Sequence, residues 1–304
     1  MPAARLSILF YHRVLPEPDP LQPGIPDAVL FRRHMRWLRR LYRVLPLAEA
    51  VMLLRGQLPR RAVAITFDDG YRDNYEVALD ILRELDLPAT FFISSGFLDG
   101  GRMWNDTVIE TVRRLPGPEL TFEPCAIRGL PLCSMEQRRR VVDQLLGALK
   151  YQPLAQRQQL CERLAARLDE PLPGLMMTRA QVRGLRQAGM EIGAHTVHHP
   201  ILKLLAPALA RAEIEQSKQA LEEILGEPIR LFAYPNGKAG QDFGPEHAAM
   251  VAEAGFQAAV TTDWGTAGAG TDPYGLPRFT PWDRPPWRFV ARLAWRRGWN
   301  RHYA

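Results

Sequence analysis

The chain has 304 residues, 46% of them hydrophobic, and a formal net charge of +6. Six arginines and no acidic residues lie in residues 284–304, so the remainder of the chain is neutral, with 33 basic and 33 acidic residues. A neutral body argues against nucleic-acid binding by a broad basic face, and no apolar run approaches the ~20 residues that a membrane-spanning helix needs.

The amino-terminal residues are expected to form a strand rather than a targeting signal. Residues 1–10 lack a long apolar stretch and a small-residue cleavage site, so residues 6–12 are interpreted as a first strand. The three cysteines, Cys125, Cys133 and Cys161, have no metal-type spacing. We therefore expect a reduced, cytoplasmic protein.

Helices and strands alternate over the next part of the chain. We predict helices at 27–42, 47–55 and 73–88, and strands at 62–67 and 89–94. Asp27 is expected to cap the first of these helices, and Pro88 to end the third. A strand, a helix and a second strand with short connections indicate a parallel sheet.

Residues 101–177 interrupt this alternation. Only helices are expected there, at 104–115, 135–149 and 154–168, with proline and glycine between them. We interpret the segment as a helical insertion within a single domain of residues 1–304.

The alternation resumes after the insertion. We predict helices at 178–188, 207–225 and 244–254, and strands at 190–194, 230–233, 257–260 and 276–279. The chain has no internal repeats and no low-complexity tract.

Two adjacent carboxylates end the apolar strand at 62–67. A buried parallel strand carries ligands at its carboxyl end, and Gly70 permits a turn directly after Asp68 and Asp69. Two neighbouring carboxylates repel each other, so a cation is expected beside them. The alternative is an acidic turn that caps the next helix.

A histidine cluster follows the strand at 190–194. His195 and His199 are four residues apart, so one helical turn would place both imidazoles on the same side. Together with Asp69 they would form two histidines and one carboxylate with open positions, which is typical of a catalytic metal site. His198 is a competing ligand, and the alternative is that these histidines cap a surface helix.

The motifs Thr66-Phe67-Asp68-Asp69-Gly70-Tyr71 and His195-Thr196-x-x-His199-Pro200 resemble those of the polysaccharide deacetylase family (NodB homology, carbohydrate esterase family 4). The resemblance extends over most of the chain, from Tyr11 to Arg278. It implies an α/β fold, a distorted (β/α)7 barrel that here carries a helical insertion. It also implies a divalent metal, most often Zn²⁺, and removal of an N-acetyl group from an amino sugar.

The same resemblance implies roles for individual residues. Asp68 is expected to be the general base, and Asp69, His195 and His199 the metal ligands. The backbone N–H of Tyr71 is expected to help stabilise the oxyanion. A bound metal would polarise the acetamide carbonyl and lower the pKa of water towards ~7, and Asp68 would take the water proton.

The chain departs from the family pattern on a later strand. Many members carry an arginine that orients the base, but Ala233 occupies that position in Phe232-Ala233-Tyr234-Pro235-Asn236-Gly237. This form resembles the branch that acts in exopolysaccharide synthesis. Arg278 is a candidate substitute, with a surface arginine as the alternative. Tyr234 is expected to line the pocket, with a packed core tyrosine as the alternative.

The general acid of many members lies in a Leu-x-His motif that this chain lacks after Tyr234, since His247 and His302 have the wrong neighbours. A barrel is cyclic, so its first strand can take the place of another member's last strand. We therefore assign the general acid to His12, which closes the first strand. The alternative is a buried histidine bonded to backbone.

We expect a metal-dependent N-deacetylase whose substrate is an N-acetylated amino-sugar polymer of surface or exopolysaccharide biosynthesis. The alternatives are an enzyme acting on a small or lipid-linked amino sugar, and a non-catalytic carbohydrate-binding barrel. The sequence leaves open which sugar is used and whether the acyl group is acetyl or formyl.

The carboxyl-terminal tail, residues 284–304, is rich in arginine, and tryptophans lie in or beside it at 282, 287, 295 and 299. Phe289, Val290 and Leu293 could form one side of a short helix at 287–297. Such a helix would suit an anionic membrane surface at the inner face of the cytoplasmic membrane. The alternative is a helix that packs on the barrel with its arginines solvated.

Overall fold

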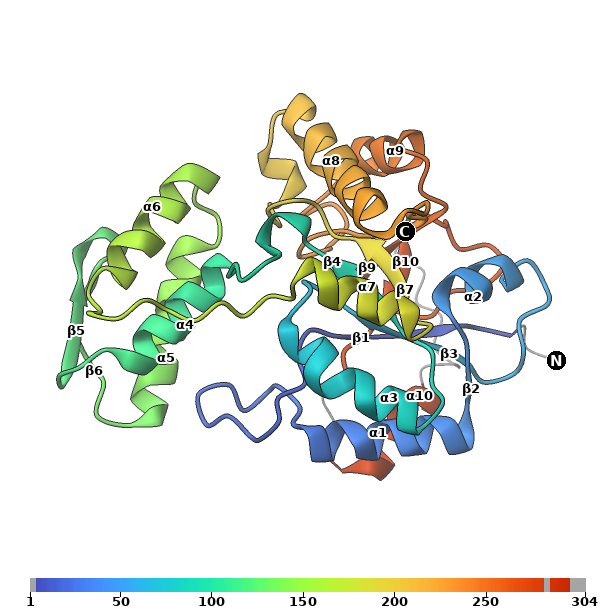
Figure 1. Ribbon diagram of the computed structural model, residues 1–304, viewed down its shortest axis with the longest axis horizontal. Helices are drawn as coiled ribbons and strands as arrows, with labels where there is room; N and C mark the ends of the chain where they lie inside the picture. Colours follow the sequence, from blue (N-terminus) through green and yellow to red (C-terminus); the bar gives the residue numbers. More distant parts are fainter. Residues whose placement is uncertain (1–3, 282–284, 296–304) are drawn as a thin grey trace. The chain divides into compact units, whose positions relative to one another are not determined.

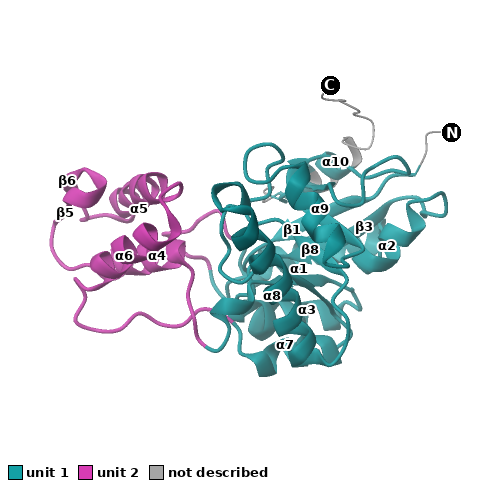
Figure 2. Cartoon of the chain, turned by 90° about the horizontal axis from the view of Figure 1, so that it is seen from above, with its two compact units in different colours: residues 1–17, 26–99, 177–304 teal, residues 18–25, 100–176 magenta. Residues whose placement is uncertain are grey.

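A computed structural model describes residues 4–281 and 285–295. Within these residues the chain forms two compact units (Figure 2). The first unit comprises three segments: the residues up to Glu17, Pro26–Asp99, and the residues from Met177 onwards. The second comprises Pro18–Ile25 and Gly100–Met176.

The first unit is built on parallel strands that follow one another around a nearly closed barrel (Figure 1). Phe279, directly after the last strand, bonds back to the first, with Phe279 N–H donating to Ile8 O at 3.0 Å and Phe10 N–H donating to Phe279 O at 3.2 Å. This closure confirms the predicted (β/α)7 barrel. In order around the ring the strands are β1 (Ser7–Tyr11), β3 (Ala62–Phe67), β4 (Thr90–Ile93), β7 (Glu191–Ala194), β8 (Leu231–Ala233), β9 (Ala258–Trp264) and β10 (Leu276–Arg278).

Helices cover the outside of this barrel. Figure 1 shows α1, α3 and α10 grouped along one side, with α8 beside α9 on another. The helices are α1 (Ala28–Leu41), α2 (Leu47–Leu53), α3 (Leu79–Glu84), α7 (Arg179–Gln187), α8 (Pro207–Leu225), α9 (Pro245–Glu253) and α10 (Pro286–Trp295). As predicted, the Asp27 side chain caps α1 by accepting the N–H of Leu30.

Two details of this unit were not predicted. A two-residue strand, β2 (Arg43–Val44), pairs with the start of β3 and is too short to give a periodic signal. A π-helical turn, η1 (Asn74–Ala78), precedes α3, where the sequence predicts one continuous helix. Such turns frequently occur beside functional sites.

Alternate residues of most barrel strands belong to two different cores. In β3, Val63, Ile65 and Phe67 pack outwards in the cluster shared with the helices, whereas Ala62 and Ala64 belong to the barrel interior. The period of two continues past the strand, so it directs Asp68 towards the interior at the carboxyl end of the barrel.

The second unit has its own apolar core, which includes Leu145 and Leu164. It contains α4 (Trp104–Arg114), α5 (Met135–Leu149) and α6 (Leu154–Ala165), close to the predicted helices. The prediction that this segment is only helical is wrong, because β5 (Glu119–Phe122) and β6 (Ile127–Pro131) form an antiparallel pair. These strands have only four and five residues and enclose a turn that contains proline. Their alternation of apolar and polar residues is therefore too short to be recognised in the sequence.

The described part of the tail packs on the barrel unit. Phe289 and Leu293 of α10 are fully buried, and the Phe289 ring stacks on His34 of α1 with centroids 4.4 Å apart. These two apolar side chains are therefore not presented to a membrane. Trp282, Arg284 and residues 296–304 of the tail prediction lie outside the described residues.

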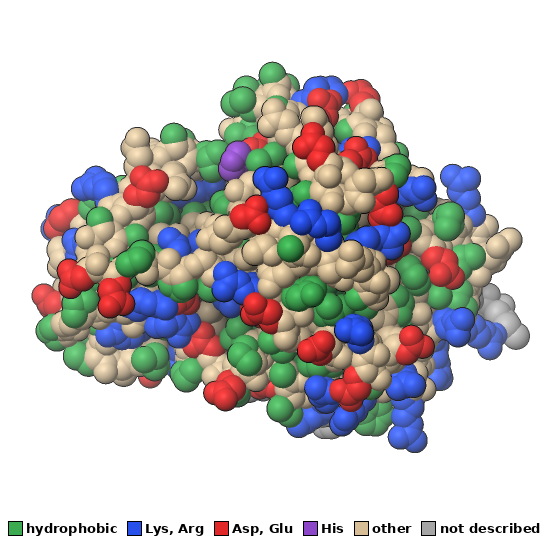
Figure 3. Space-filling view, in the orientation of Figure 1, with side chains coloured by type: hydrophobic (Ala, Val, Ile, Leu, Met, Phe, Trp, Pro, Cys, Tyr) green, Lys and Arg blue, Asp and Glu red, His purple; other side chains and the backbone are tan. Residues whose placement is uncertain are grey.

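Among the described helices, none has the length and apolarity that crossing a membrane requires. On the face shown in Figure 3, basic and acidic side chains are intermingled, as expected from the neutral charge of the body of the chain.

We predict that Gly193→Ala lowers the free energy of unfolding of the barrel by about 1–3 kcal/mol, the usual cost of overpacking. A Cβ at Gly193 would lie 2.5 Å from Cδ1 of Phe92 and 3.0 Å from the carbonyl oxygen of Leu231. Urea unfolding measures the change. Gly270→Ala, where a Cβ meets nothing within 4 Å, serves as the control, and equal stability of the two variants would contradict the prediction.

Candidate active site

The chain turns sharply at the carboxyl end of β3. Asp69 and Gly70 both have positive φ, 78° and 92°, and the Gly70 N–H donates to the carbonyl oxygen of Asp68 at 3.0 Å. The turn breaks the strand alternation, so two consecutive carboxylates reach the same interior. Asp68 is 2% exposed and Asp69 5%.

The loop after β7 supplies the histidines. The prediction of a helical turn there is wrong, because residues 195–200 are not helical and Thr196 and His199 have positive φ, 62° and 50°. Thr196 Oγ1 accepts the His199 N–H at 3.1 Å. The loop nevertheless brings both imidazoles together, with ring centroids 4.8 Å apart.

Asp69, His195 and His199 form one group of candidate metal donors. Asp69 Oδ1 lies 3.4 Å from His195 Nε2 and 3.5 Å from His199 Nε2, and one ligand atom of each residue lies within 4.8 Å of the others. Tetrahedral coordination with bonds of about 2.0–2.1 Å separates donor atoms by roughly 3.3 Å. The two distances from Asp69 Oδ1 therefore fit a zinc-sized ion.

The orientation of the donors also fits a metal. His195 Nδ1–H donates to the carbonyl oxygen of Ala233 at 2.7 Å, which turns Nε2 towards Asp69, as in histidines that bind metals. Burial lowers the pKa of His195, but the hydrogen bond to Asp69 and the two carboxylates outweigh burial and raise it, so a bound metal would replace the proton on Nε2. Burial lowers the pKa of His199 to about 4, which leaves its ring neutral. Asp69 Oδ1 is buried without a hydrogen-bond partner, and a cation would satisfy it.

Asp68 is held by Arg278 rather than by the metal donors. The guanidinium donates Nη1–H to Oδ1 at 2.7 Å and Nη2–H to Oδ2 at 2.6 Å. Arg278 is fully buried, so it is not the surface arginine considered as the alternative. Burial alone would raise the pKa of Asp68, but Arg278, with His195, holds that pKa below its usual range. Asp68 is therefore ionised at neutral pH.

Arg278 is itself fixed inside the barrel. Its Nε–H donates to the carbonyl oxygen of Thr261 at 2.9 Å, and Nη1–H also donates to Thr66 Oγ1 at 3.1 Å. The guanidinium carbon lies 4.5 Å from the centroid of the Phe10 ring. Thr66 and Phe10 were not singled out from the sequence, although each precedes a predicted site residue by two positions on its strand.

His12 lies at the carboxyl end of β1, beside Asp68. Tyr11 pairs with Phe67, and the Asp68 N–H donates to the Tyr11 carbonyl oxygen at 2.9 Å. The His12 residue is exposed, in contrast to the buried histidine considered as the alternative.

The structure also locates Tyr71, Tyr234 and His198, which the sequence analysis considered as site residues. Tyr71, after the turn, is 2% exposed, and Arg13 lies over its ring. Tyr234 is fully buried; its ring stacks on Phe243 at 3.8 Å and its hydroxyl donates to the Tyr274 carbonyl oxygen, which is the packing of a core tyrosine. His198 lies outside the donor group because its Nδ1 faces Glu213 at 2.8 Å.

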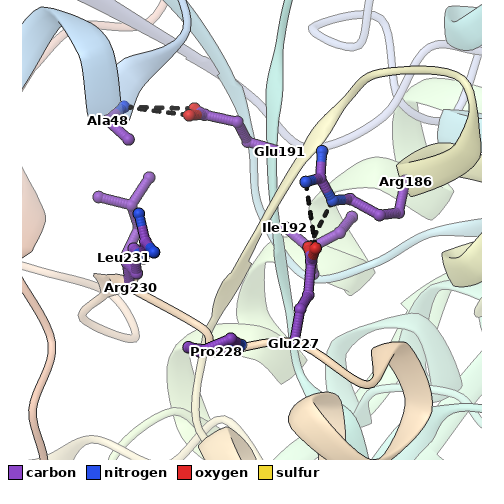
Figure 4. A pocket seen from close by; sticks show the side chains of 8 residues that line it. All are labelled: Ala48, Arg186, Glu191, Ile192, Glu227, Pro228, Arg230 and Leu231. Atoms are coloured by element: carbon purple, nitrogen blue, oxygen red, sulfur yellow. Dashed lines mark hydrogen bonds and ion pairs between the residues drawn. The ribbon is translucent and has the colours of Figure 1, made fainter.

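A concavity lies at the opposite, amino ends of β7 and β8 (Figure 4). Three of its four charged lining residues are engaged with one another or with backbone. Arg186 Nη2–H donates to Glu227 at 3.1 Å, and Glu191 accepts the N–H of Leu47 at the start of α2 at 2.7 Å. The chemistry-bearing cluster is therefore the one at the carboxyl ends.

The chain matches the family described as "Polysaccharide deacetylase" over residues 55–117 and 136–259. A similar protein is the "Putative polysaccharide deacetylase YxkH" of Bacillus subtilis (strain 168). It is 23% identical over 278 residues, which are 90% of this chain and 71% of that protein. The family match includes the two carboxylates and the two histidines, whereas His12 and Arg278 lie outside it.

Two solved structures have a similar fold. The Streptococcus pyogenes deacetylase PplD, in complex with acetate, gives a TM-score of 0.65 at 20% identity and covers 96% of this chain and 99% of its own. IcaB from Ammonifex degensii gives a TM-score of 0.64 at 20% identity and covers 97% of this chain and 98% of its own. Both support the barrel fold.

We predict that Arg278→Met lowers the free energy of unfolding at neutral pH by about 3–5 kcal/mol, because it leaves the buried Asp68 carboxylate unpaired. The pKa of Asp68 is lowered in the folded protein. The contribution of the ion pair is thus present above the carboxyl pKa of the unfolded chain and is lost as the pH falls through the lower, folded pKa. The difference from wild type should shrink in acid.

Urea unfolding at neutral and at successively lower pH measures this difference. The double variant Asp68→Asn/Arg278→Met removes both charges and should be less destabilised than Arg278→Met alone. Unchanged stability of Arg278→Met at neutral pH would show that the ion pair is energetically unimportant.

Proposed function

Because this chain belongs to the polysaccharide deacetylase family, we propose that it is a metal-dependent hydrolase that removes the N-acetyl group from an amino sugar of a surface polysaccharide or exopolysaccharide. The observation that carries the proposal is the buried group of Asp69, His195 and His199, with Asp69 Oδ1 unsatisfied, next to the paired Asp68. The similar S. pyogenes deacetylase was solved with acetate, the product expected here.

The divalent ion would be held by Asp69 Oδ1, His195 Nε2 and His199 Nε2. Zn²⁺ is the ion that this set of donors suits best. When bound, such an ion polarises the amide carbonyl and lowers the pKa of water towards ~7. The three donors leave a position for water or substrate, as in other catalytic zinc sites. The Ala233 carbonyl fixes the His195 ring in the required tautomer.

Asp68 is proposed as the general base that accepts the proton of the attacking water. In many family members an arginine at the position of Ala233 orients the base. In this chain Arg278 is proposed to take that role. Both of its Nη–H groups hold the carboxylate, so Asp68 stays ionised and fixed in direction. The proton it accepts would remain close to the site for transfer onward.

His12 is proposed as the general acid that protonates the leaving amine. Its position next to Asp68 at the carboxyl end of β1, and its exposure, suit a group that must reach a polymer. The backbone N–H of Tyr71, just past the turn, is proposed as an oxyanion donor. Tyr234 is not included, because its ring is buried in the core.

The test of the function is acetate release from N-acetylhexosamine oligomers, with lipid-linked N-acetyl sugars as a second arm. Release from the oligomers supports a polysaccharide deacetylase. Release from the lipid-linked sugars alone would change the substrate class. Release from neither by the metal-loaded protein would contradict catalysis and favour a carbohydrate-binding barrel.

We predict that His195→Ala abolishes stoichiometric Zn²⁺ binding, because it removes one of three donors. Metal analysis of the purified, Zn²⁺-equilibrated protein measures occupancy. The matched control is His198→Ala, in the same loop but with its ring directed to Glu213, which should keep one ion per chain. Full occupancy in His195→Ala would refute the ligand assignment.

We predict that Asp68→Asn keeps the metal but loses turnover, because the group that deprotonates water is gone. His12→Ala should slow the reaction by ~10²–10⁴-fold. Rates of acetate release over a range of pH separate the two roles. A His12→Ala enzyme with an unchanged pH–rate profile would eliminate the assignment of the acid to the first strand.

A further inference from the structure

The loop of residues 195–199, here called the histidine loop, has a strained backbone. Thr196 and His199 both have left-handed φ, 62° and 50°. A β-branched residue such as threonine rarely adopts this conformation. Conformations of this kind cost free energy and persist only where surrounding contacts enforce them. The contacts that hold this loop therefore decide where its two imidazoles point.

The carbonyl groups of the loop are held by the segment that follows β4. Ser94 Oγ donates to the His195 carbonyl oxygen at 3.0 Å. The N–H groups of Ser95 and Gly96 donate to the carbonyl oxygens of Thr196 and Val197 at 3.2 and 2.9 Å. A Cβ at Gly96 would lie 2.8 Å from the Val197 oxygen, so this approach requires glycine.

The amide groups of the loop are held from the other direction by Glu213 of α8. Glu213 Oε2 accepts the N–H of Val197 at 2.9 Å and that of His198 at 2.8 Å, and Oε1 lies 2.8 Å from His198 Nδ1. The Glu213 side chain is only 13% exposed. Hydrogen bonds from backbone N–H to a carboxylate are charge-assisted and stronger than neutral ones.

We propose that Glu213 is a positioning residue of the metal site. It contacts none of the three donor atoms. Instead it fixes Val197 and His198, two of the three residues between the histidines. As a result, His195 Nε2 and His199 Nε2 remain 3.4 and 3.5 Å from Asp69 Oδ1. The inference rests on the metal binding proposed above. It adds a residue that lies outside both the Asp68–Asp69 motif and the His195–His199 motif. Replacing residues that orient metal ligands without binding the metal commonly weakens metal affinity by ~10–100-fold.

A purely structural role for Glu213 would be to anchor α8. Glu222 provides the comparison, because it is a carboxylate on the same helix that also accepts a backbone N–H, from Ile229 at 2.9 Å, and bonds Lys218 Nζ at 2.7 Å. Neither of these two partners of Glu222 belongs to the histidine loop. Loss of helix anchoring alone should therefore affect both variants alike.

The experiment measures Zn²⁺ affinity of the full chain by competition with a chromophoric chelator, together with the unfolding temperature of each metal-free protein. Glu213→Ala should weaken Zn²⁺ binding by ~10–100-fold. Glu213→Gln, which keeps an oxygen for the two N–H groups, should restore most of the affinity. Glu222→Ala and His198→Ala should bind Zn²⁺ like the wild type.

The outcomes distinguish this inference from the function proposed above. A wild-type protein that binds no Zn²⁺ would contradict the metal site itself. Wild-type binding with unchanged affinity in Glu213→Ala, or an equal loss in Glu222→Ala, would overturn the role of Glu213 alone. If Glu213→Ala does not fold, Glu213→Asp replaces it. Its carboxylate is one methylene short, so it should also weaken binding, and unchanged affinity would again overturn the inference.

Discussion

The buried ion pair between Asp68 and Arg278 is the interaction on which the arrangement of the site depends. It joins β3 to β10, two strands on either side of β1, and both of its members are almost inaccessible to solvent. A buried charge without a partner is costly. The pair therefore requires the barrel to close, and closure places an ionised carboxylate beside the candidate metal donors.

The site also depends on two breaks in regular structure. Strand alternation alone would direct Asp68 and Asp69 to opposite faces, and the left-handed turn at Asp69 and Gly70 overrides it. The histidine loop likewise turns through two left-handed residues rather than through a helix. In both places the backbone gives up regular hydrogen bonding and is supported by specific side-chain or loop contacts, which is common where function demands an unusual geometry.

Much of the fold could be predicted from local patterns. The helix at 207–225 begins and ends at the predicted residues because Pro207 and Gly226 mark its ends, and the apolar strand before Asp68 has a clear composition. The pairing of Asp68 with Arg278 has no local signal, since the two residues are 210 positions apart. Arg278 was nevertheless considered as a partner of Asp68 through the family resemblance. Glu213 was not anticipated, because its role comes from a loop that adopts no standard conformation. The β5–β6 pair was missed because its strands are short.

The long separation between the two members of the ion pair has a consequence for the order of folding. During synthesis from the amino end, Asp68 and the early strands leave the ribosome well before β10 does. Until Arg278 arrives, the growing chain contains a carboxylate that it cannot bury favourably. We expect the nascent protein to keep the seam between β1 and β10 open and solvated, so that the candidate site is assembled in the final step rather than with the first strands.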